Sequence, residues 1–179
     1  MEEMGLFEAM HSQRQITRYK PDPVPREAIE KILEAATRAP SGGNTQPWHF
    51  VAITDRQLIA QIGQIYRELW LGARGATSPS GESPVYRAAR YLARHMPEVP
   101  AMILICVDHS QGSAPLTPGQ PIQRGRYASS IWLAAQNLFL AARALGLGTR
   151  LTTTHLGREA EIKALLGIPD HVETVALTP

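Results

Sequence analysis

Residues 127–145 form the stretch that most limits how this chain can fold. They are predicted to be one long helix ended by Gly146 and Gly148, because glycine favours the backbone conformation that terminates a helix. Apolar side chains occur on nearly all sides of this helix: Ile131, Trp132, Leu133, Leu138, Phe139, Leu140 and Leu145. A helix that is hydrophobic all round must be central or shared with a partner subunit. We therefore expect the fold to be built around this helix, or a second copy to pack along it.

Helical and extended segments alternate along the rest of the chain. Helices are predicted for residues 5–10, 25–39, 56–70, 84–95 and 158–166, and strands for 50–53, 101–107, 150–154 and 171–177. Many of the connections are too short for regular right-handed crossovers between parallel strands. The pattern predicts an α+β sandwich with a mainly antiparallel sheet flanked by helices. A chain of this length, residues 1–179, is expected to form one domain.

Composition excludes several classes of protein. Hydrophobic residues make up 44% of the chain and charged residues 19%, and no uncharged run is long enough to span a membrane. The acidic start, Met1-Glu2-Glu3, has no signal-peptide pattern, so we expect a cytoplasmic protein. A single cysteine, Cys106, excludes an internal disulfide framework, and its apolar neighbours predict a buried, inert thiol.

Arginine dominates the basic residues. It supplies 15 of the 18 lysines and arginines, and its planar guanidinium group suits a phosphorylated small ligand. The basic residues are scattered, without a basic block or a basic strand interleaved with aromatic residues, so nucleic-acid binding is not indicated. Arg87, Arg90 and Arg94 recur along one side of the predicted helix 84–95. Such a row is either a solvated face or a ligand-binding one.

A turn-forming cluster separates the helix predicted for residues 25–39 from the first strand. Its two adjacent glycines, Gly42 and Gly43, allow positive φ and remove the side chains that would keep a ligand away from the backbone. One interpretation is a turn that points several peptide groups at a planar, polar ligand, with Trp48 and Phe50 anchoring its far end. The other is a tight helix-to-strand connection with an aromatic plug.

Several well-known catalytic motifs are missing from the sequence. It has no G-x-G-x-x-G after a strand, no Walker loop and no G-x-S-x-G elbow. The six histidines never pair at metal-ligand spacing with one another or with Cys106, so no metal site is predicted. An enzyme without an evident nucleophile, metal or acid–base pair must take its chemistry from a cofactor, so no catalytic side chain is assigned.

Five segments together resemble one family: residues 13–19, 23–25, 39–48, 134–138 and 142–149. They closely resemble the FMN-dependent nitroreductase family, and the Ala-Pro-Ser…Asn…Gln-Pro-Trp block within residues 39–48 is specific to it. A further segment, Thr152-Thr153-Thr154, resembles a flavin-contacting segment of the deiodinase-like branch. The likeness extends over nearly the whole chain.

The resemblance implies a homodimeric α+β fold with one FMN at each subunit interface, much of that interface being formed by helix 127–145. In family members the early basic segment binds the flavin phosphate and the pyrimidine edge; the matching residues here are Gln13, Arg14, Gln15 and Thr17. The turn that lies along the isoalloxazine ring near its N5 matches Pro40, Ser41, Gly42, Gly43 and Asn44. The segment that packs against the ring from the other side matches Thr152, Thr153 and Thr154.

The chain departs from the family pattern in two places. Gln13, Gln15 and Thr17 stand where relatives commonly have arginine, a small residue and a second basic residue. That second cation lies near N1 and O2 of the reduced ring, so Thr17 predicts an altered redox potential, although Arg14 is retained and Arg18 lies one position further on. Relatives also continue past the last strand into a Gly-Tyr-Pro turn and an arm with basic phosphate ligands. Because this chain stops at Pro179, we expect either a missing arm or a weaker hold on FMN.

The resemblance implies an oxidoreductase that transfers two electrons from NADH or NADPH to an electron-poor acceptor, such as a nitroaromatic or a quinone, by a ping-pong mechanism. Residues from about 66 to 96 are expected to form a lid. The lid residues expected to face the substrate are Tyr66, Trp70, Tyr86, Arg87 and Arg90. Two alternatives stay open: a flavin-binding or sequestering protein with little turnover, and a dimeric scaffold that has lost FMN.

Overall fold

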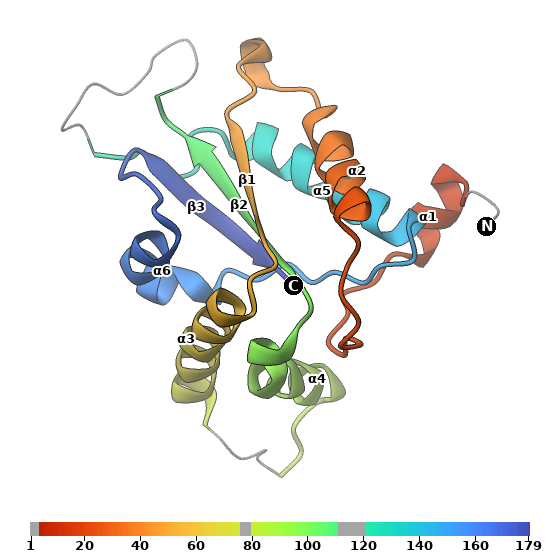
Figure 1. Cartoon of the computed structure of the whole chain (residues 1–179), viewed down its shortest axis with the longest axis vertical. Coiled ribbons are helices and arrows are strands. Elements are labelled where there is room, and N and C mark those ends of the chain that lie inside the picture. The colour runs from red at the N-terminus through yellow and green to blue at the C-terminus, as the bar shows by residue number, and fades with distance from the viewer. Residues whose placement is uncertain (1–3, 76–79, 111–120) are drawn as a thin grey trace.

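A three-stranded antiparallel sheet forms the centre of the computed structural model, which describes residues 4–75, 80–110 and 121–179 (Figure 1). The strands are β1 (Trp48–Ile53), β2 (Met102–Asp108) and β3 (Val172–Thr178), in the order β1-β2-β3. Trp48 pairs with Val107 at one end of β1 and Ile53 with Met102 at the other. The prediction of an α+β fold with an antiparallel sheet is confirmed.

Helices cover the sheet from two sides (Figure 1). On one side lie α1 (Leu6–Ser12), α2 (Arg26–Thr37) and α5 (Ala128–Ala144), and on the other lie α3 (Arg56–Arg74), α4 (Pro84–His95) and α6 (Glu159–Leu166). The core is divided accordingly, because one buried cluster joins the sheet to α2 and α5 and a second joins it to α3, α4 and α6. Every residue of β2 is buried, since both of its faces are covered.

Capping side chains account for where the helices begin and end. Asp55 accepts hydrogen bonds from the backbone N–H groups of Gln57 and Leu58 at the start of α3, as an N-cap carboxylate does. Ser83 caps α4 through the N–H of Tyr86, and Pro84 occupies its first turn, where no donor is needed. These local signals explain why the helices predicted at both places are found.

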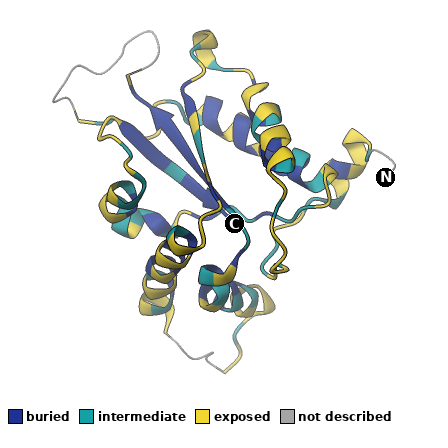
Figure 2. Ribbon diagram, in the orientation of Figure 1, coloured by how far each residue is buried: buried dark blue, intermediate teal, exposed yellow. Residues whose placement is uncertain are grey.

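The apolar helix predicted for residues 127–145 is α5, and it is central as expected. Its residues Leu138, Ala134 and Ala142 are fully buried. One side nevertheless faces solvent, because 40% of Trp132 and 48% of Leu133 are exposed. The neighbouring helix α1 is exposed as well, with Leu6 at 62% and Phe7 at 74%, and it stands out in Figure 2. The molecule therefore presents unburied apolar side chains on α5 and α1.

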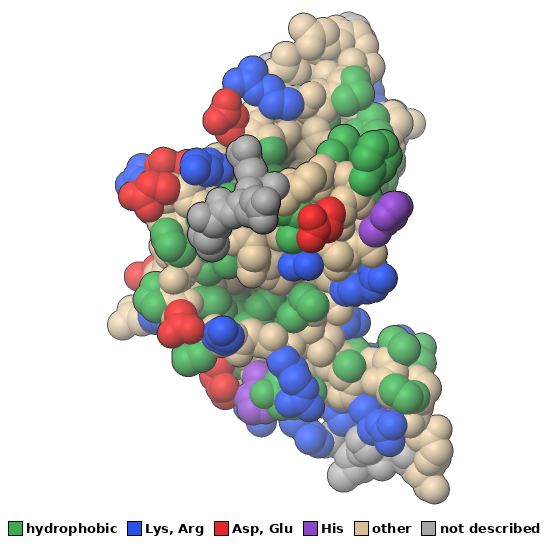
Figure 3. All heavy atoms as spheres, turned by 90° about the vertical axis from the view of Figure 1, so that its right-hand side faces the viewer, with side chains coloured by type: hydrophobic (Ala, Val, Ile, Leu, Met, Phe, Trp, Pro, Cys, Tyr) green, Lys and Arg blue, Asp and Glu red, His purple; other side chains and the backbone are tan. Residues whose placement is uncertain are grey.

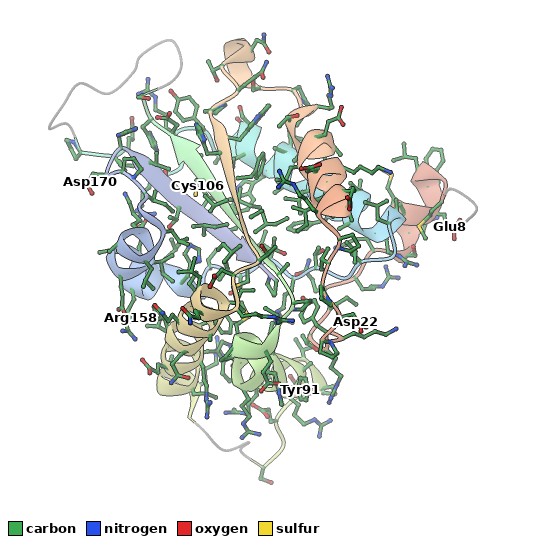
Figure 4. All side chains as sticks on the ribbon, viewed as in Figure 1. Glu8, Asp22, Tyr91, Cys106, Arg158 and Asp170 are labelled. Atoms are coloured by element: carbon green, nitrogen blue, oxygen red, sulfur yellow. The ribbon has the colours of Figure 1, made fainter. Side chains whose placement is uncertain are left out.

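The prediction of a strand at residues 150–154 is wrong. Only an isolated bridge between Thr152 and Leu177 forms there, and residues Thr154–Arg158 make a 3₁₀ helix, η3. The Thr152 hydroxyl accepts a hydrogen bond from the N–H of Thr154 at 3.2 Å, which turns the chain out of the extended conformation. Cys106 is buried in the sheet (Figure 4), and burial raises the pKa of its thiol to about 12, so the predicted inert thiol is confirmed.

Candidate functional site

The predicted flavin-binding segments 13–17 and 152–154 are joined through residues 149–151. Gln15 forms a parallel bridge with Thr149, and the N–H of Ile16 donates to the Thr149 carbonyl at 2.9 Å. The side-chain oxygen of Gln15 accepts a hydrogen bond from the N–H of Leu151 at 2.7 Å. These contacts place Gln15 and Thr17 beside the chain that leads to Thr153.

The side chains along these two segments differ in how far they are buried. Thr149 and Thr152 are 8% and 7% exposed, whereas Thr153 lies at the surface. We call Gln15, Thr17, Leu151 and Thr153 the platform; none of them is buried. Leu151 is not among the residues predicted from the sequence, because its contact with Gln15 joins segments far apart in the chain and has no local sequence signal. Of the predicted threonines, Thr152 is buried and Thr154 is half-buried.

The predicted turn, residues 40–44, is exposed apart from half-buried Ser41, and it includes a short 3₁₀ helix, η1 (Gly42–Asn44). Gly43 has φ +60°, as its glycine suggested, while Asn44 and Gln46 also adopt positive φ. The Ser41 hydroxyl accepts from the Gln46 N–H at 3.0 Å, and the Gln46 amide donates to the Asn44 side chain at 3.0 Å. The hydroxyl of Thr45 is buried without a hydrogen-bond partner in the described structure. Hydrogen bonds therefore fix the shape of the turn, while the Thr45 hydroxyl makes none in the described structure.

The turn and the platform lie at opposite ends of α5. At the N-terminal end, the N–H of Gly42 donates to the Ser130 hydroxyl at 3.1 Å. At the C-terminal end, Arg143 donates to the Ser12 hydroxyl at 2.9 Å, just before the segment that carries Gln15. At about 1.5 Å of rise per residue, Ser130 and Arg143 are separated by about 20 Å along the helix axis. One copy of the chain therefore does not bring the turn onto its own platform (Figure 1).

A cavity of about 510 Å³ lies behind the segment 13–20, within the size range of small-molecule sites. Gln13 and Arg14, two of the predicted phosphate-binding residues, line it. Its walls are largely apolar, and its cations are Arg14, Arg18, Lys20 and Arg143. Within residues 4–75, 80–110 and 121–179, no carboxylate forms an ion pair with any of these four. Asp22 also lines the cavity, but it forms no ion pair with these four cations in the described structure, and positive charge without a carboxylate partner suits a phosphate group.

The predicted lid residues fall into two groups. Tyr66 and Trp70 are 2% and 8% exposed and belong to the core between α3 and α4, because helical spacing places them on the same face as Ile59 and Ile62. Tyr86 and Arg87 are exposed on α4. The lid connection itself lies partly outside the described residues, at 76–79.

Arg90 is also an interior residue, whereas Arg87 and Arg94, the other two arginines of the row predicted along α4, are exposed. Its guanidinium group is 2.6 Å from the Glu82 carboxylate, both side chains are more than nine-tenths buried, and it also donates to the carbonyl of Gly75. The cation lies 5.1 Å from the centroid of the Trp70 ring. Arg90 therefore connects the end of α3 to the start of α4, and its contacts are structural.

Other buried polar groups lie at the far end of the sheet. His109 is 2.7 Å from the Glu173 carboxylate, and His155 is 3.2 Å from the Thr174 hydroxyl. Burial lowers the pKa of His155 to about 4, so this imidazole is neutral near pH 7. No group of three or more potential metal ligands occurs in the part of the chain that the structure describes, and no helix there is long and apolar enough to cross a membrane.

Comparisons with known proteins agree with this architecture. A sequence model of the Nitroreductase family matches residues 11–178. The chain is 30% identical to an NADH dehydrogenase of Thermus thermophilus, over 92% of this chain and 80% of that one. It is 29% identical to a Methanothermobacter thermautotrophicus protein provisionally named NADH dehydrogenase/NAD(P)H nitroreductase, over 98% and 76% of the two chains. A solved structure of oxidised iodotyrosine deiodinase bound to FMN and 3-iodo-L-tyrosine matches 98% of this chain and 88% of its own, with 25% identity and a TM-score of 0.72.

Proposed function

The chain belongs to the Nitroreductase family, and from that premise we propose that it is an FMN-dependent oxidoreductase whose working unit is a homodimer. One copy supplies the platform and the other supplies the turn. The observation that carries this proposal is the separation of about 20 Å between the two along α5. A second copy packed on the exposed side of α5, where Trp132 and Leu133 lie, brings a turn from outside and buries apolar surface.

The residues present fit a flavin mononucleotide. Arg14, whose guanidinium group donates hydrogen bonds to the carbonyls of His11 and Gln13, offers a cation for the phosphate, together with Lys20 and Arg143 of the cavity. Gln15 and Thr153 offer polar groups for a heterocycle, and Leu151 offers an apolar surface. The glycines of the partner's turn allow a close approach of backbone N–H groups to the ring. FMN, when bound, supplies the two-electron chemistry, for which no side chain of the site is suited.

We propose NADH or NADPH as the electron donor and an electron-poor molecule, such as a nitroaromatic or a quinone, as the acceptor. The two bind in turn at the same open side of the platform. The names of the archaeal and Thermus relatives support the donor. Tyr86 and Arg87 remain proposed substrate-side residues because they are exposed on α4, whereas Tyr66, Trp70 and Arg90 act through packing.

Anaerobic reduction tests this proposal. Protein loaded with FMN should lose the long-wavelength absorbance of oxidised flavin when NADH or NADPH is added, and regain it when a quinone follows. Reduction by dithionite alone, with neither nicotinamide active, would instead support a flavin-binding protein with little turnover. That second candidate is favoured by Thr17, which places no positive charge on the platform. A protein that takes up no added FMN would refute both.

A further inference from the structure

One face of α4 gathers cationic and aromatic side chains. Tyr91 lies four residues after Arg87, and Arg94 and His95 lie three and four residues after Tyr91. At this spacing the side chains lie along the same side of the helix. Arg87 and Arg94 are exposed, and Tyr91 and His95 are half-buried. Arg90, which the sequence pattern grouped with Arg87 and Arg94, points into the core instead. Arg87 and Arg94 are therefore the arginines that remain on the exposed side of α4.

The extended segment before α2 adds a further cation to this face. The guanidinium carbon of Arg18 lies 3.7 Å from the centroid of the Tyr91 ring, and the imidazole of His95 stacks on that ring with centroids 4.2 Å apart. His95 in turn lies 3.0 Å from the Glu98 carboxylate. Figure 4 labels Tyr91 on α4 and Asp22 on the extended segment that follows Arg18. The stack holds the Arg18 guanidinium group in one place, which reduces the entropy lost when it binds a ligand.

Two of the cations on this face have no carboxylate partner among the residues that the structure describes. In the described parts of the chain, no ion pair involves Arg18 or Arg87. Arg94 adds a third positive charge, and Arg14 and Lys20 lie on the same segment as Arg18. Figure 3 shows Lys and Arg side chains gathered over the lower part of the molecule, where α4 lies in Figure 1. We call Arg18, Arg87, Tyr91 and Arg94 the α4 basic face.

We propose that the α4 basic face binds a phosphomonoester, and that this phosphate is the 2′-phosphate of NADPH. A phosphomonoester carries roughly two negative charges near pH 7 and three acceptor oxygens, which match the planar donor forks of arginine. Arg18 directly follows Thr17 of the platform, so the basic face begins where the proposed nicotinamide site ends. The assignment of the phosphate to NADPH rests on the proposed function; the binding of a phosphomonoester does not.

Binding of oxidised dinucleotides tests the proposal without turnover. NADP⁺ and NAD⁺ differ only in the 2′-phosphate, and their affinities are measured by calorimetry on the FMN-loaded protein at low salt. We expect NADP⁺ to bind at least about tenfold more tightly, since hydrogen bonds to a charged group contribute strongly to affinity. The preference should shrink as salt is raised, because exposed charges are screened. Inorganic phosphate should compete with NADP⁺ and leave NAD⁺ unaffected.

Two substitutions locate the effect. Arg87→Gln changes a side chain with no ion-pair partner in the described structure, so folding is undisturbed, and Arg18→Gln removes the stacked cation. Each should lower the ratio of the NADP⁺ affinity to the NAD⁺ affinity several-fold. Lys31→Gln, an exposed change on α2, alters net charge equally and should keep the preference. Equal affinities of the wild-type protein for NADP⁺ and NAD⁺, or a preference that survives both arginine changes, would overturn the proposal.

The outcomes separate this proposal from the proposed function. If NADPH and NADH reduce the flavin equally well and NADP⁺ shows no preference, the oxidoreductase proposal stands and the α4 basic face has another role. If NADP⁺ binds preferentially but neither nicotinamide reduces the flavin, the phosphate site stands and the reductase proposal fails.

Discussion

Gly148 lies directly against the proposed flavin-binding segment 13–17, so we predict that an added methyl group there disturbs cofactor binding. A Cβ placed on Gly148 would be 2.7 Å from Cγ1 of Ile16, 3.0 Å from its Cβ and 3.1 Å from its Cγ2. Ile16 stands between Gln15 and Thr17 of the platform. A β-branched side chain has little freedom at χ1, so Ile16 cannot rotate away from the new methyl group. The Gly148→Ala change must therefore move the segment itself.

Overpacking of this kind costs about 1–3 kcal/mol, and three contacts at or below 3.1 Å place this one near the middle, at about 2 kcal/mol. If the platform absorbs the shift, the affinity for FMN falls by up to about 30-fold, because each 1.4 kcal/mol is a factor of about ten. Titration of the apoprotein with FMN, followed through the quenching of flavin fluorescence, measures the affinity. Urea unfolding of the apoprotein measures the remaining cost in the free energy of unfolding.

Ile16→Ala provides the control, since it removes two of the three crowded atoms. In the Ile16→Ala background, Gly148→Ala should cost much less than in the wild type, so that a double-mutant cycle gives a coupling energy of about 2 kcal/mol. Wild-type FMN affinity and stability in Gly148→Ala, or an equal penalty in both backgrounds, would refute the close packing of Gly148 on the platform.

Three further predictions concern stability. Gly63→Ala should lower the melting temperature by about 4–8 °C, because its Cβ would meet the backbone of Pro97 at 2.5 Å. Gly72→Ala, whose Cβ would have no heavy atom of the described residues within 4 Å, should raise it slightly. A stabilised Gly63→Ala would argue against the packing of α3. Arg90→Met should lower the free energy of unfolding in urea by about 3 kcal/mol, because it removes the cation that faces the buried Glu82 carboxylate. The double variant Arg90→Met/Glu82→Leu should recover part of the loss, and the absence of any recovery would contradict this explanation. Burial lowers the pKa of His155 to about 4, so between about pH 6.5 and pH 4 the unfolded state binds a proton that the folded state does not. The free energy of unfolding should therefore drop by up to about 3 kcal/mol as the pH falls over that interval. A His155→Leu variant with the same pH dependence would contradict the assignment.

Local signals account for the parts of the fold that could be predicted from the sequence. Asp55 before α3 and Pro84 in the first turn of α4 mark helix starts through hydrogen bonds and backbone geometry within a few residues. The apolar run of β2 predicts a strand that is buried on both faces, and this prediction does not require knowing which strands lie beside it. The turn at residues 40–44 was predicted for the same reason, since glycine there meets a local requirement for positive φ.

Tertiary context decides the parts that could not be predicted. Arg87 and Arg90 look alike in the sequence, but the Glu82 carboxylate draws only Arg90 into the interior. Tyr66 falls within the range expected to form a lid, but it belongs to the apolar stripe of α3, and only the packing of α4 shows that this stripe is covered. The distance between the turn and the platform depends on how both attach to α5, through Ser130 and Arg143, and neither contact has a sequence signature.

The central claim is that two copies of the chain complete each flavin site. Sedimentation velocity of the FMN-loaded protein, recorded in the visible absorbance band of the flavin, tests it most directly. The account predicts that all bound flavin sediments with a species of about twice the 19.7 kDa mass of one chain, and that Trp132→Asp, on the exposed side of α5, shifts the protein to the monomer and releases the flavin. Flavin that sediments stoichiometrically with a single chain would contradict it.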